Sequence, residues 1–458
     1  MVDGRTNGPR RSSSESAGAR RRALANEQRL LALGEAVDRR TGVARKQPRQ
    51  GGKNTKRNVV IVGVSLLLVI VLVLGGGWLY ANWRFGQITK VNVAGEQQAA
   101  SGQPFNILSI GSDSRVGLTG SVASETGASS NQVAGQRSDS VKIIHVDPQA
   151  GTISVLSIPR DTMVSLLANQ SLYGNTNRIN VNFASGPSLV GQTITANWGI
   201  PLNHTVVVSF SGLMGAAQAV GGIKLNFPYP AFDPYSGLFV SHTGCQLLQG
   251  YQALALSRSR HFYYNTKYKA VRWPGTNLSD SQLYAEGWIY DGSSDFGRIK
   301  RQDAFLNGLV ARAKHIYNPL TLNAFISSLP KGISLDSNFT LNDLVSLALR
   351  FHGISPSSIK YYTLPTVSGY SKIVGDVLYA QQPAVQELLT KVFGSELKTP
   401  TNPPPNQTGA TPLPPVIAST TTTSTIVAKK KSKATSVPVT TTTVAGADTA
   451  DYFDPTPC

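Results

Sequence analysis

The longest apolar run of the chain lies near its N-terminus, at Val59–Ala81. Its 23 consecutive residues carry no charge and are rich in Val, Leu and Ile. At a rise of about 1.5 Å per residue, a helix of this length crosses a hydrocarbon core of about 30 Å. The leader before it is too long for a cleaved signal peptide, and Gly75–Trp78 is not a small-x-small cleavage site. The pattern predicts one retained transmembrane helix over 58–83.

Shorter apolar runs between residues 102 and 398 alternate in type. Four have the composition or alternation of strands: Pro104–Ile110, Ser140–Val146, Thr152–Ile158 and His204–Phe210. Others have helical spacing or helix start signals: 211–222, with Ser211 as its N-cap, 299–317, 340–351 and a segment from Pro383. Strands alternating with helices predict the α/β class, as a three-layer α-β-α sandwich with a mixed central sheet.

Composition changes after Lys398. Residues 399–458 are rich in Pro, Thr and Lys and keep few apolar side chains to offset the entropy of ordering, so we expect a disordered Pro/Thr-rich tail. Two cysteines exclude a disulfide-dense scaffold and a Cys-rich zinc module. We do not expect Cys245 to pair with Cys458 across such a tail, although an outer compartment would permit a disulfide.

Charge is concentrated before the apolar run. The formal net charge is +18, and residues 1–57 carry 15 Lys and Arg against 5 Asp and Glu, whereas only Arg84 and Lys90 closely follow the run. This asymmetry predicts a single-pass cell-membrane protein with a cytoplasmic N-terminus and an extracytoplasmic remainder. We interpret 1–57 as a disordered arm facing membrane lipids and 84–101 as a juxtamembrane linker. The arm lacks interleaved aromatic residues, and no nucleic-acid partner is expected.

Within 102–398, arginine and aspartate recur together where predicted elements begin or end. The five clusters are Asp113-Ser-Arg115, Arg137-Ser-Asp139, Arg160-Asp161, Arg258-Ser-Arg260, and Asp295–Gln302 with Arg298 and Arg301. Ligands of open α/β sheets sit outside strand ends, so Asp113, Arg115, Arg160 and Asp161 could converge at one edge of the sheet. The Arg258 and Arg260 side chains can face one site only if the chain there is extended. Arg298 and Arg301 share one helix face.

Arginine suits an anionic substrate. A guanidinium stays charged at any working pH and grips phosphate oxygens with two parallel hydrogen bonds. Several of them around Asp113 and Asp139 fit a pyrophosphate shared between arginines and a divalent ion. Each cluster taken singly is also consistent with an ordinary surface ion pair, worth about 0–1 kcal/mol.

The order of these segments resembles the LytR–CpsA–Psr family of cell-wall glycopolymer ligases, over roughly residues 104–395. The matching stretches are Asn106–Arg115, Arg137–Ser140, Val155–Thr162, Arg178–Pro187, Leu248–His261 and Asp295–Gln302. Between the last two lies an aromatic-rich insert, whose rings either stack on sugars or simply pack.

The resemblance implies a membrane-anchored phosphotransferase that moves a glycopolymer from a polyprenyl-pyrophosphate carrier onto a peptidoglycan hydroxyl, releasing polyprenyl phosphate. It implies Mg²⁺ (or Mn²⁺) held by Asp113 and Asp139, and an apolar tunnel for the lipid. By motif, the catalytic phosphate-holding residues are Arg115, Arg137, Arg160, Arg258 and Arg298. Further substrate contacts fall on Arg260, Arg301, Asp161 and Gln302.

Two other functions remain open. In one, a non-catalytic or regulatory membrane protein uses the arginines only to recognise an anionic wall polymer. In the other, a lipid pyrophosphatase uses water in place of a sugar hydroxyl. The general base of a transferase is open between Asp161 and Asp139.

Overall fold

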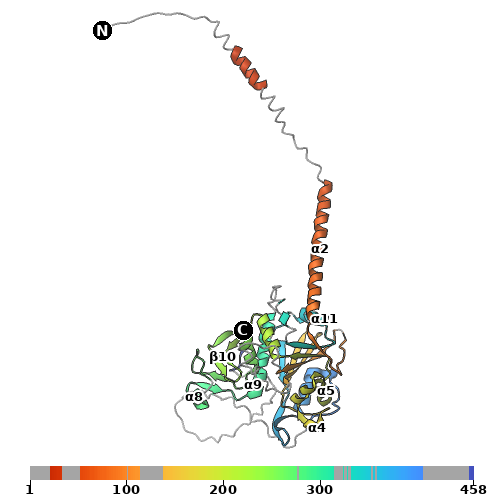
Figure 1. Cartoon of the computed structure of the whole chain (residues 1–458), viewed down its shortest axis with the longest axis vertical. Coiled ribbons are helices and arrows are strands. Elements are labelled where there is room, and N and C mark those ends of the chain that lie inside the picture. Colours follow the sequence, from red (N-terminus) through yellow and green to blue (C-terminus); the bar gives the residue numbers. More distant parts are fainter. Residues whose placement is uncertain are drawn as a thin grey trace, which may run out of the picture. The chain divides into compact units, whose positions relative to one another are not determined.

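The computed structural model describes residues 21–32, 52–100, 102–113, 138–275, 278–313, 323, 327–328, 332–351, 354–355, 358–405 and 453–458. The chain divides into two compact units, Met1–Trp78 and Leu79–Cys458. The first contains an exposed helix over residues 21–32 and most of α2 (Gly52–Phe85) (Figure 1). Within α2, the segment Asn58–Phe85 is long and apolar enough to cross a membrane.

A seven-stranded mixed sheet forms the centre of the second unit, in the order β1-β14-β7-β2-β3-β4-β15. Its strands are β1 (Thr89–Val91), β2 (Phe105–Ser112), β3 (Ser138–Asp147), β4 (Thr152–Ile158), β7 (His204–Val208), β14 (Ile333–Asp336) and β15 (Ile359–Thr363). The predicted hairpin is present, since β3 pairs with β4 in antiparallel fashion, and β2 pairs with β7 in parallel. The sheet is therefore mixed, as predicted.

Helices cover both faces of this sheet. They are α5 (Pro187–Trp198) and α12 (Ala384–Phe393) on one face, and α6 (Phe210–Ala219), α7 (Gly250–Arg258) and α9 (Ser294–Ala313) around a cavity on the other. Alternate side chains of a strand point to opposite faces. Leu108 and Ile143 accordingly pack into the core with α5 and α12, whereas Ser109 and Lys142 line the cavity. The three-layer α-β-α prediction is confirmed.

Smaller elements surround these layers. Two further sheets have the orders β10-β9-β12-β13 and β11-β8-β18, and β5–β6 and β16–β17 form hairpins. The strands are β5 (Met163–Ser165), β6 (Thr176–Arg178), β8 (Ile223–Phe227), β9 (Ala231–Asp233), β10 (Leu238–Val240), β11 (Gly244–Leu248), β12 (Tyr263–Asn265), β13 (Trp288–Tyr290), β16 (Thr366–Ser371), β17 (Gly375–Ala380) and β18 (Thr456–Pro457). The remaining helices are α4 (Gln170–Tyr173), η1 (Ile179–Ser185), α8 (Asp280–Ala285), α11 (Leu341–Phe351) and η4 (Gly394–Glu396).

Local capping signals set the helix starts. The Thr340 hydroxyl accepts a hydrogen bond from the Asp343 backbone N–H, and the Asp343 carboxylate accepts one from the Thr340 N–H, which opens α11 where the sequence predicts it. The predicted N-cap of α6 is wrong by two residues. Ser209, not Ser211, accepts a hydrogen bond from the Gly212 N–H, because the strand before it already ends at Val208.

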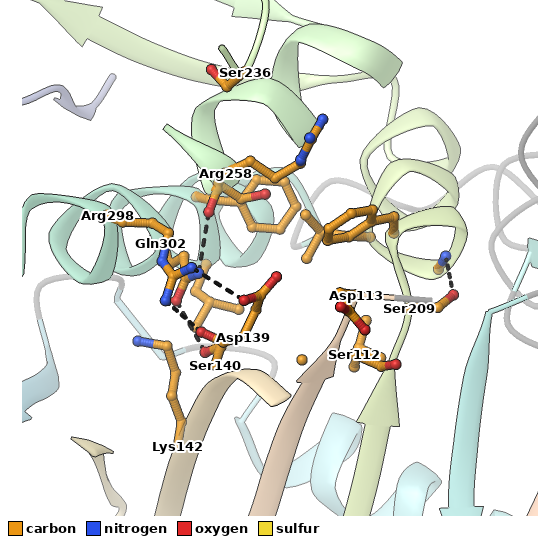
Figure 2. Close-up of a pocket in the computed structure, with 18 of the residues that line it drawn as sticks. Ser112, Asp113, Asp139, Ser140, Lys142, Ser209, Ser236, Arg258, Arg298 and Gln302 are labelled. Atoms are coloured by element: carbon orange, nitrogen blue, oxygen red, sulfur yellow. Dashed lines mark hydrogen bonds and ion pairs between the residues drawn. The ribbon is translucent and has the colours of Figure 1, made fainter. Parts of the chain in front are cut away.

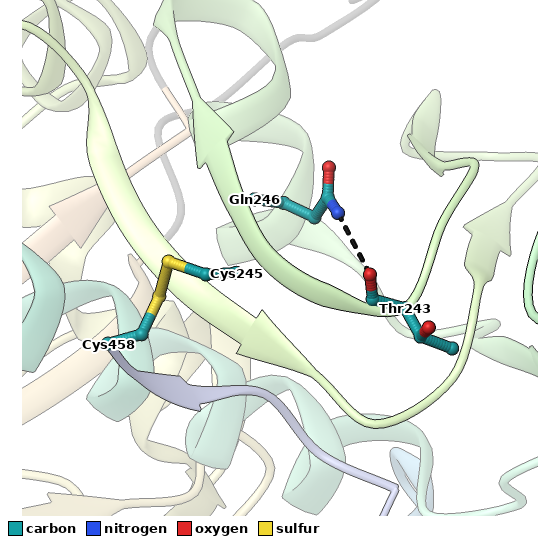
Figure 3. Close-up of a disulfide and its surroundings, with 4 residues drawn as sticks. All are labelled: Thr243, Cys245, Gln246 and Cys458. Carbon is teal, nitrogen blue, oxygen red and sulfur yellow. Dashed lines mark hydrogen bonds between the residues drawn. A yellow bond between two sulfur atoms is a disulfide. The ribbon is translucent and has the colours of Figure 1, made fainter.

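The last six residues of the chain belong to the fold. Cys458 forms a disulfide with Cys245 of β11, and β18 pairs with β8 (Figure 3). The Phe453 ring is buried and stacks on Tyr264, with centroids 4.6 Å apart. The prediction of unpaired cysteines is therefore wrong, and so is the prediction of disorder for residues 453–458. It is also wrong for residues 399–405, because the backbone N–H groups of Thr401 and Asn402 donate hydrogen bonds to the Ala196 carbonyl. Residues 406–452 of the predicted tail lie outside the described residues.

Candidate functional site

A cavity of about 560 Å³ lies between the central sheet and helices α6, α7 and α9 (Figure 2). Its character changes along α9, whose side chains lining it run from Arg298 and Gln302 to Phe305 and Leu309. At 1.5 Å per residue this change from charged to apolar spans about 16 Å. The other apolar lining residues are Val208, Phe210, Leu213, Ala216, Leu306 and Ile333. The cavity can therefore hold a ligand with an anionic head and an apolar body.

Two carboxylates stand at one edge of the sheet. β2 and β3 are antiparallel neighbours, so Asp113, which follows β2, and Asp139, at the start of β3, come from the same edge and both line the cavity (Figure 2). The Asp139 Oδ1 atom accepts a hydrogen bond from Arg160 Nη1 at 2.6 Å and lies 3.7 Å from Arg298 Nη1. Of the residues that the strand-end argument brings together, Asp113 and Arg160 both line the cavity, and Asp139 of β3 and Arg298 of α9 join them there.

Asp295 joins three arginines. Its Oδ1 atom lies 2.7 Å from Arg260 Nη2, 2.8 Å from Arg298 Nη2 and 4.0 Å from Arg160 Nε. These guanidinium groups come from three different elements of the chain. The three positive charges repel one another, and the negative charge of the Asp295 carboxylate at the start of α9 offsets this repulsion.

The chain between Arg258 and Arg260 is extended, as their spacing requires. α7 ends at Arg258, and Ser259 has φ −63° and ψ 121°. The buried Asp233 carboxylate holds this turn, because its Oδ2 atom accepts hydrogen bonds from Ser259 Oγ and from the backbone N–H groups of Arg260 and His261, at 2.7–2.8 Å. Both arginines consequently line the cavity.

Burial and neighbouring charges change the pKa values of Arg298 and Arg160 in opposite directions. Burial lowers the pKa of Arg298 to about 10, although the neighbouring Asp295 opposes the change. Burial also lowers the pKa of Arg160, but the charges of Asp161 and its other acidic neighbours outweigh it and raise the net value. Both side chains remain cationic at neutral pH. The Nε atoms of Arg260 and Arg298 are buried and have no hydrogen-bond partner among the described residues.

A buried ion pair lies below this cluster. Lys142 Nζ is 2.6 Å from both Asp303 Oδ1 and Ser157 Oγ. Burial raises the pKa of Asp303, while the Lys142 charge opposes the change. Beside this pair, Gln302 accepts a hydrogen bond from Ser140 Oγ and donates one to the Ser257 carbonyl, which ties α9 to both β3 and α7.

The cavity gathers most of the predicted site residues. Those lining it are Asp113, Asp139, Arg160, Arg258, Arg260, Arg298 and Gln302. Arg115 and Arg137 lie outside the described residues. Asp161, predicted to contact substrate, does not line the cavity; its carboxylate instead lies 3.5 Å from both Arg160 Nε and Arg178 Nε. We therefore reassign Asp161 to the support of Arg160.

Arg301 is also reassigned. Its side chain is fully buried and does not line the cavity. Its Nη1 atom lies 2.7 Å from Asp291 Oδ2 and 3.1 Å from Asp454 Oδ1, and its guanidinium lies over the Phe262 ring at 4.4 Å. The prediction of a substrate contact fails because the C-terminal segment supplies a partner that no local pattern reveals.

The lining residues that the sequence analysis did not assign to the site include Lys142, Asp233 and Tyr235. The Lys142 position carries a signal in hindsight, since a lysine in the middle of an apolar strand is rarely buried without a partner. Asp233 precedes Pro234 in a turn, a common place for aspartate, so the sequence offers no reason to assign it to the site. The sequence shows Asp295 within a cluster, but it does not show that three arginines share the Asp295 carboxylate.

The two carboxylates fit a magnesium ion that also binds phosphate. Among the described residues, no three His, Cys, Asp or Glu side chains form a metal-binding group. Mg²⁺ usually keeps several waters and takes one or two protein carboxylates together with substrate phosphates. Asp113 and Asp139 supply that number of protein ligands, so a divalent ion here would depend on the phosphate-bearing substrate.

Comparison with known proteins places this geometry in a family. The chain is 26% identical to "Probable cell wall biosynthesis protein LcpB" of Corynebacterium glutamicum, over 78% of this chain and 75% of that protein. It is 26% identical to the polyisoprenyl-teichoic acid–peptidoglycan teichoic acid transferase TagV of Bacillus subtilis, over 67% and 70%. The fold is similar to that of a LytR-Csp2A-Psr enzyme from Actinomyces oris, with a TM-score of 0.50 and 20% identity over 69% and 99%. The LytR_cpsA_psr family model matches residues 83–266 and 288–393, and the chain therefore belongs to the LytR–CpsA–Psr family.

Proposed function

We propose that this protein transfers a glycopolymer from a polyprenyl-pyrophosphate carrier onto a peptidoglycan hydroxyl and releases polyprenyl phosphate. One observation carries the proposal: a single cavity is lined by arginines and three carboxylates at one part and by apolar side chains further along α9. That combination fits a diphosphate attached to a long hydrocarbon. Family membership and the name of the TagV relative support a wall-polymer transferase.

Positioning and charge neutralisation carry most of the catalysis in phosphoryl transfer. Arg258, Arg260 and Arg298 would hold the diphosphate oxygens and stabilise the charge that builds on the bridging oxygen as polyprenyl phosphate leaves. Asp295 keeps the guanidinium groups of Arg260 and Arg298 together before the substrate binds, so little reorganisation of these two is needed. A Mg²⁺ or Mn²⁺ ion bound by Asp113 and Asp139 would supply further positive charge at the phosphates.

The apolar part of the cavity would hold the prenyl chain. Phe210 and Leu213 of α6 face Phe305 and Leu309 of α9 across it. Burial of hydrocarbon contributes about 0.8 kcal/mol per CH₂ group, so several isoprene units would supply much of the donor's affinity. The Lys and Arg asymmetry around α2 favours placement of this site on the outer side of the cell membrane, where peptidoglycan lies.

The test is polymer transfer by the full chain, from a polyprenyl-pyrophosphate-linked oligosaccharide to peptidoglycan sacculi with Mg²⁺. We expect Arg298→Ala and Asp113→Ala each to lower the rate by about 10²–10³, as loss of an oxyanion donor does. Lys372→Ala removes one positive charge from an exposed position outside the cavity, and this control should keep the wild-type rate.

Full activity in both site variants would refute the assignment. Release of polyprenyl phosphate without attachment of polymer to the sacculi would instead establish a lipid pyrophosphatase. Donor binding without cleavage would establish a non-catalytic wall-polymer-binding protein. Omission of the divalent ion tests the metal, because a rate that survives chelation would remove Mg²⁺ from the proposal.

A further inference from the structure

We propose that a row of aromatic side chains beside the cavity binds the sugar residues of the lipid-linked donor. The row consists of Tyr235, His261, Tyr290 and Tyr263. This inference rests on the proposed function, which supplies the reason for a glycan to leave the cavity at this point. It adds a carbohydrate subsite and the residues that form it.

The four rings are consecutive neighbours. The centroids of Tyr235 and His261 are 4.5 Å apart, those of His261 and Tyr290 are 6.3 Å apart with nearly parallel planes, and those of Tyr290 and Tyr263 are 5.2 Å apart. Tyr235 and His261 also line the cavity, together with Arg260. The row therefore begins at the arginines and continues outward over β12 and β13.

The side chains of the row are exposed to solvent, whereas the side chains packed beneath it are buried in a hydrophobic cluster. Tyr235 is 73% exposed and Tyr290 43% exposed, and His261 is exposed as well. Phe232, Leu283 and Trp288 lie buried in a separate hydrophobic cluster that includes Tyr263 at its edge. Packing already explains the buried layer. It does not explain adjacent rings left in water, and a contiguous apolar patch of this kind typically marks a binding surface.

A segment outside the family match supports the row. The family match stops at residue 266 and resumes at 288, so residues 267–287 fall outside it. This segment contains α8, whose Asp280 carboxylate accepts a hydrogen bond from Tyr263 Oη at 2.8 Å. Leu283 of α8 packs in the cluster below. The insert thus fixes the outer end of the row. This contact gives the insert a role beyond the chemistry that the family shares.

The chemistry of the row suits sugars. A sugar ring has an apolar C–H face and hydroxyl edges, and tyrosine offers an apolar face with a polar tip. Burial, and then the negative charge of Asp291, raise the pKa of Tyr290, and burial raises that of Tyr263. Both phenols are therefore neutral at working pH. They can exchange hydrogen bonds with hydroxyl groups and do not repel the nearby phosphates.

The glycan of the lipid-linked donor is the ligand that we expect on the row, because the row continues from the cavity. Its first sugar is covalently joined to the pyrophosphate, so a diphosphate held by Arg258 and Arg260 delivers that sugar to the edge of the cavity. Tyr235 and His261 are the aromatic lining residues at that edge. A glycan leaving there meets Tyr290 next.

Calorimetric titration of the full chain in detergent with Mg²⁺ tests the subsite. The two ligands are geranyl pyrophosphate, which has no sugar, and geranyl-pyrophosphoryl-N-acetylglucosamine. We expect Tyr235→Ala and Tyr290→Leu each to weaken binding of the sugar-bearing ligand by about two- to tenfold, the effect of one aromatic contact, and to leave geranyl pyrophosphate unchanged. Tyr290→Phe keeps the ring and should bind like wild type. Tyr284→Ala, which removes a 75%-exposed ring outside the row, is the matched control.

Equal weakening of both ligands would overturn the inference, because the rings would then act only through packing. Chitotetraose is a soluble mimic of the peptidoglycan backbone. If Tyr235→Ala and Tyr290→Leu lose binding to chitotetraose but bind the sugar-bearing donor like wild type, the inference is also overturned, because the row would then bind the acceptor. Failure of the wild type to bind geranyl pyrophosphate would refute the proposed function itself and is distinguishable from both results.

Discussion

The Cys245–Cys458 disulfide fastens the end of the chain to the folded unit, and its removal tests how much stability that closure provides. The two residues are 213 positions apart. The double variant Cys245→Ser/Cys458→Ser removes the bond without leaving a free thiol. Residues 453–458 would then be held by noncovalent contacts, which include the short β18–β8 pairing, the Phe453–Tyr264 stack and the Asp454–Arg301 ion pair.

The expected magnitude follows from the loop length. In the chain-entropy relation, a cross-link closing a loop of this size restricts the unfolded chain by about 5 kcal/mol at 25 °C, and measured values run up to about that figure. A loss of about 3–5 kcal/mol corresponds to a decrease in Tm of about 5–8 °C for a unit of this size. Few single changes outside the core have so large an effect.

Thermal unfolding followed by circular dichroism measures this difference. Wild type treated with dithiothreitol should unfold at the temperature of the double variant, and dithiothreitol should not change the variant. Asp454→Asn, with the disulfide intact, separates the contribution of the ion pair from that of the covalent closure. A double variant that unfolds at the wild-type temperature would refute the reasoning, because the C-terminal segment would then not be tied to the fold.

Three further predictions concern single side chains. Asp233→Ala should lower the rate of polymer transfer at least tenfold, because the turn that presents Arg260 loses its hydrogen-bond acceptor. Measurement of kcat and KM checks this. Asp295→Asn leaves clustered arginines without their shared anion and should lower stability by about 1–3 kcal/mol, and inorganic pyrophosphate should raise its Tm more than that of wild type. Burial raises the pKa of Glu96 to about 7 despite a hydrogen bond from Thr205, so its contribution to stability is full below about pH 4.5 and decreases as pH rises through 7. Glu96→Gln should remove that dependence of Tm.

Each of these has a contrary result. Asp233→Ala with wild-type kinetics would mean that the turn is held by other contacts. An Asp295→Asn protein whose Tm responds to pyrophosphate no more than wild type would mean that the arginines do not bind phosphate. Equal decreases of Tm between pH 5 and pH 8 in wild type and Glu96→Gln would assign the pH dependence to other groups.

Much of the fold follows from local pattern. The alternation of β2 and β3 predicts which side chains enter the core, since Leu108 and Ile143 occupy one face and Ser109 and Lys142 the other. Helix start signals such as Thr340 act within one turn and are equally legible. The spacing of Arg258 and Arg260 even dictates an extended chain between them, which Ser259 adopts.

The residue types of the site can likewise be read from the sequence, because arginine and aspartate recur together where predicted elements begin or end. Their partners cannot be read in this way. Arg298 and Arg301 lie on one helix and have the same local signal, yet one lines the cavity and the other is buried against Asp454, 153 positions along the chain.

The sequence by itself determined the fold class of the protein, its apolar helix and the residue types of its site, since these depend on periodicity and on residue type. Tertiary structure alone decided which arginine faces the cavity, that Asp233 and Asp295 organise the arginines, and that the chain end closes onto β8. The physical reason is that such contacts join residues far apart in the chain. Packing of the whole unit sets their distances, and no spacing within one segment records them.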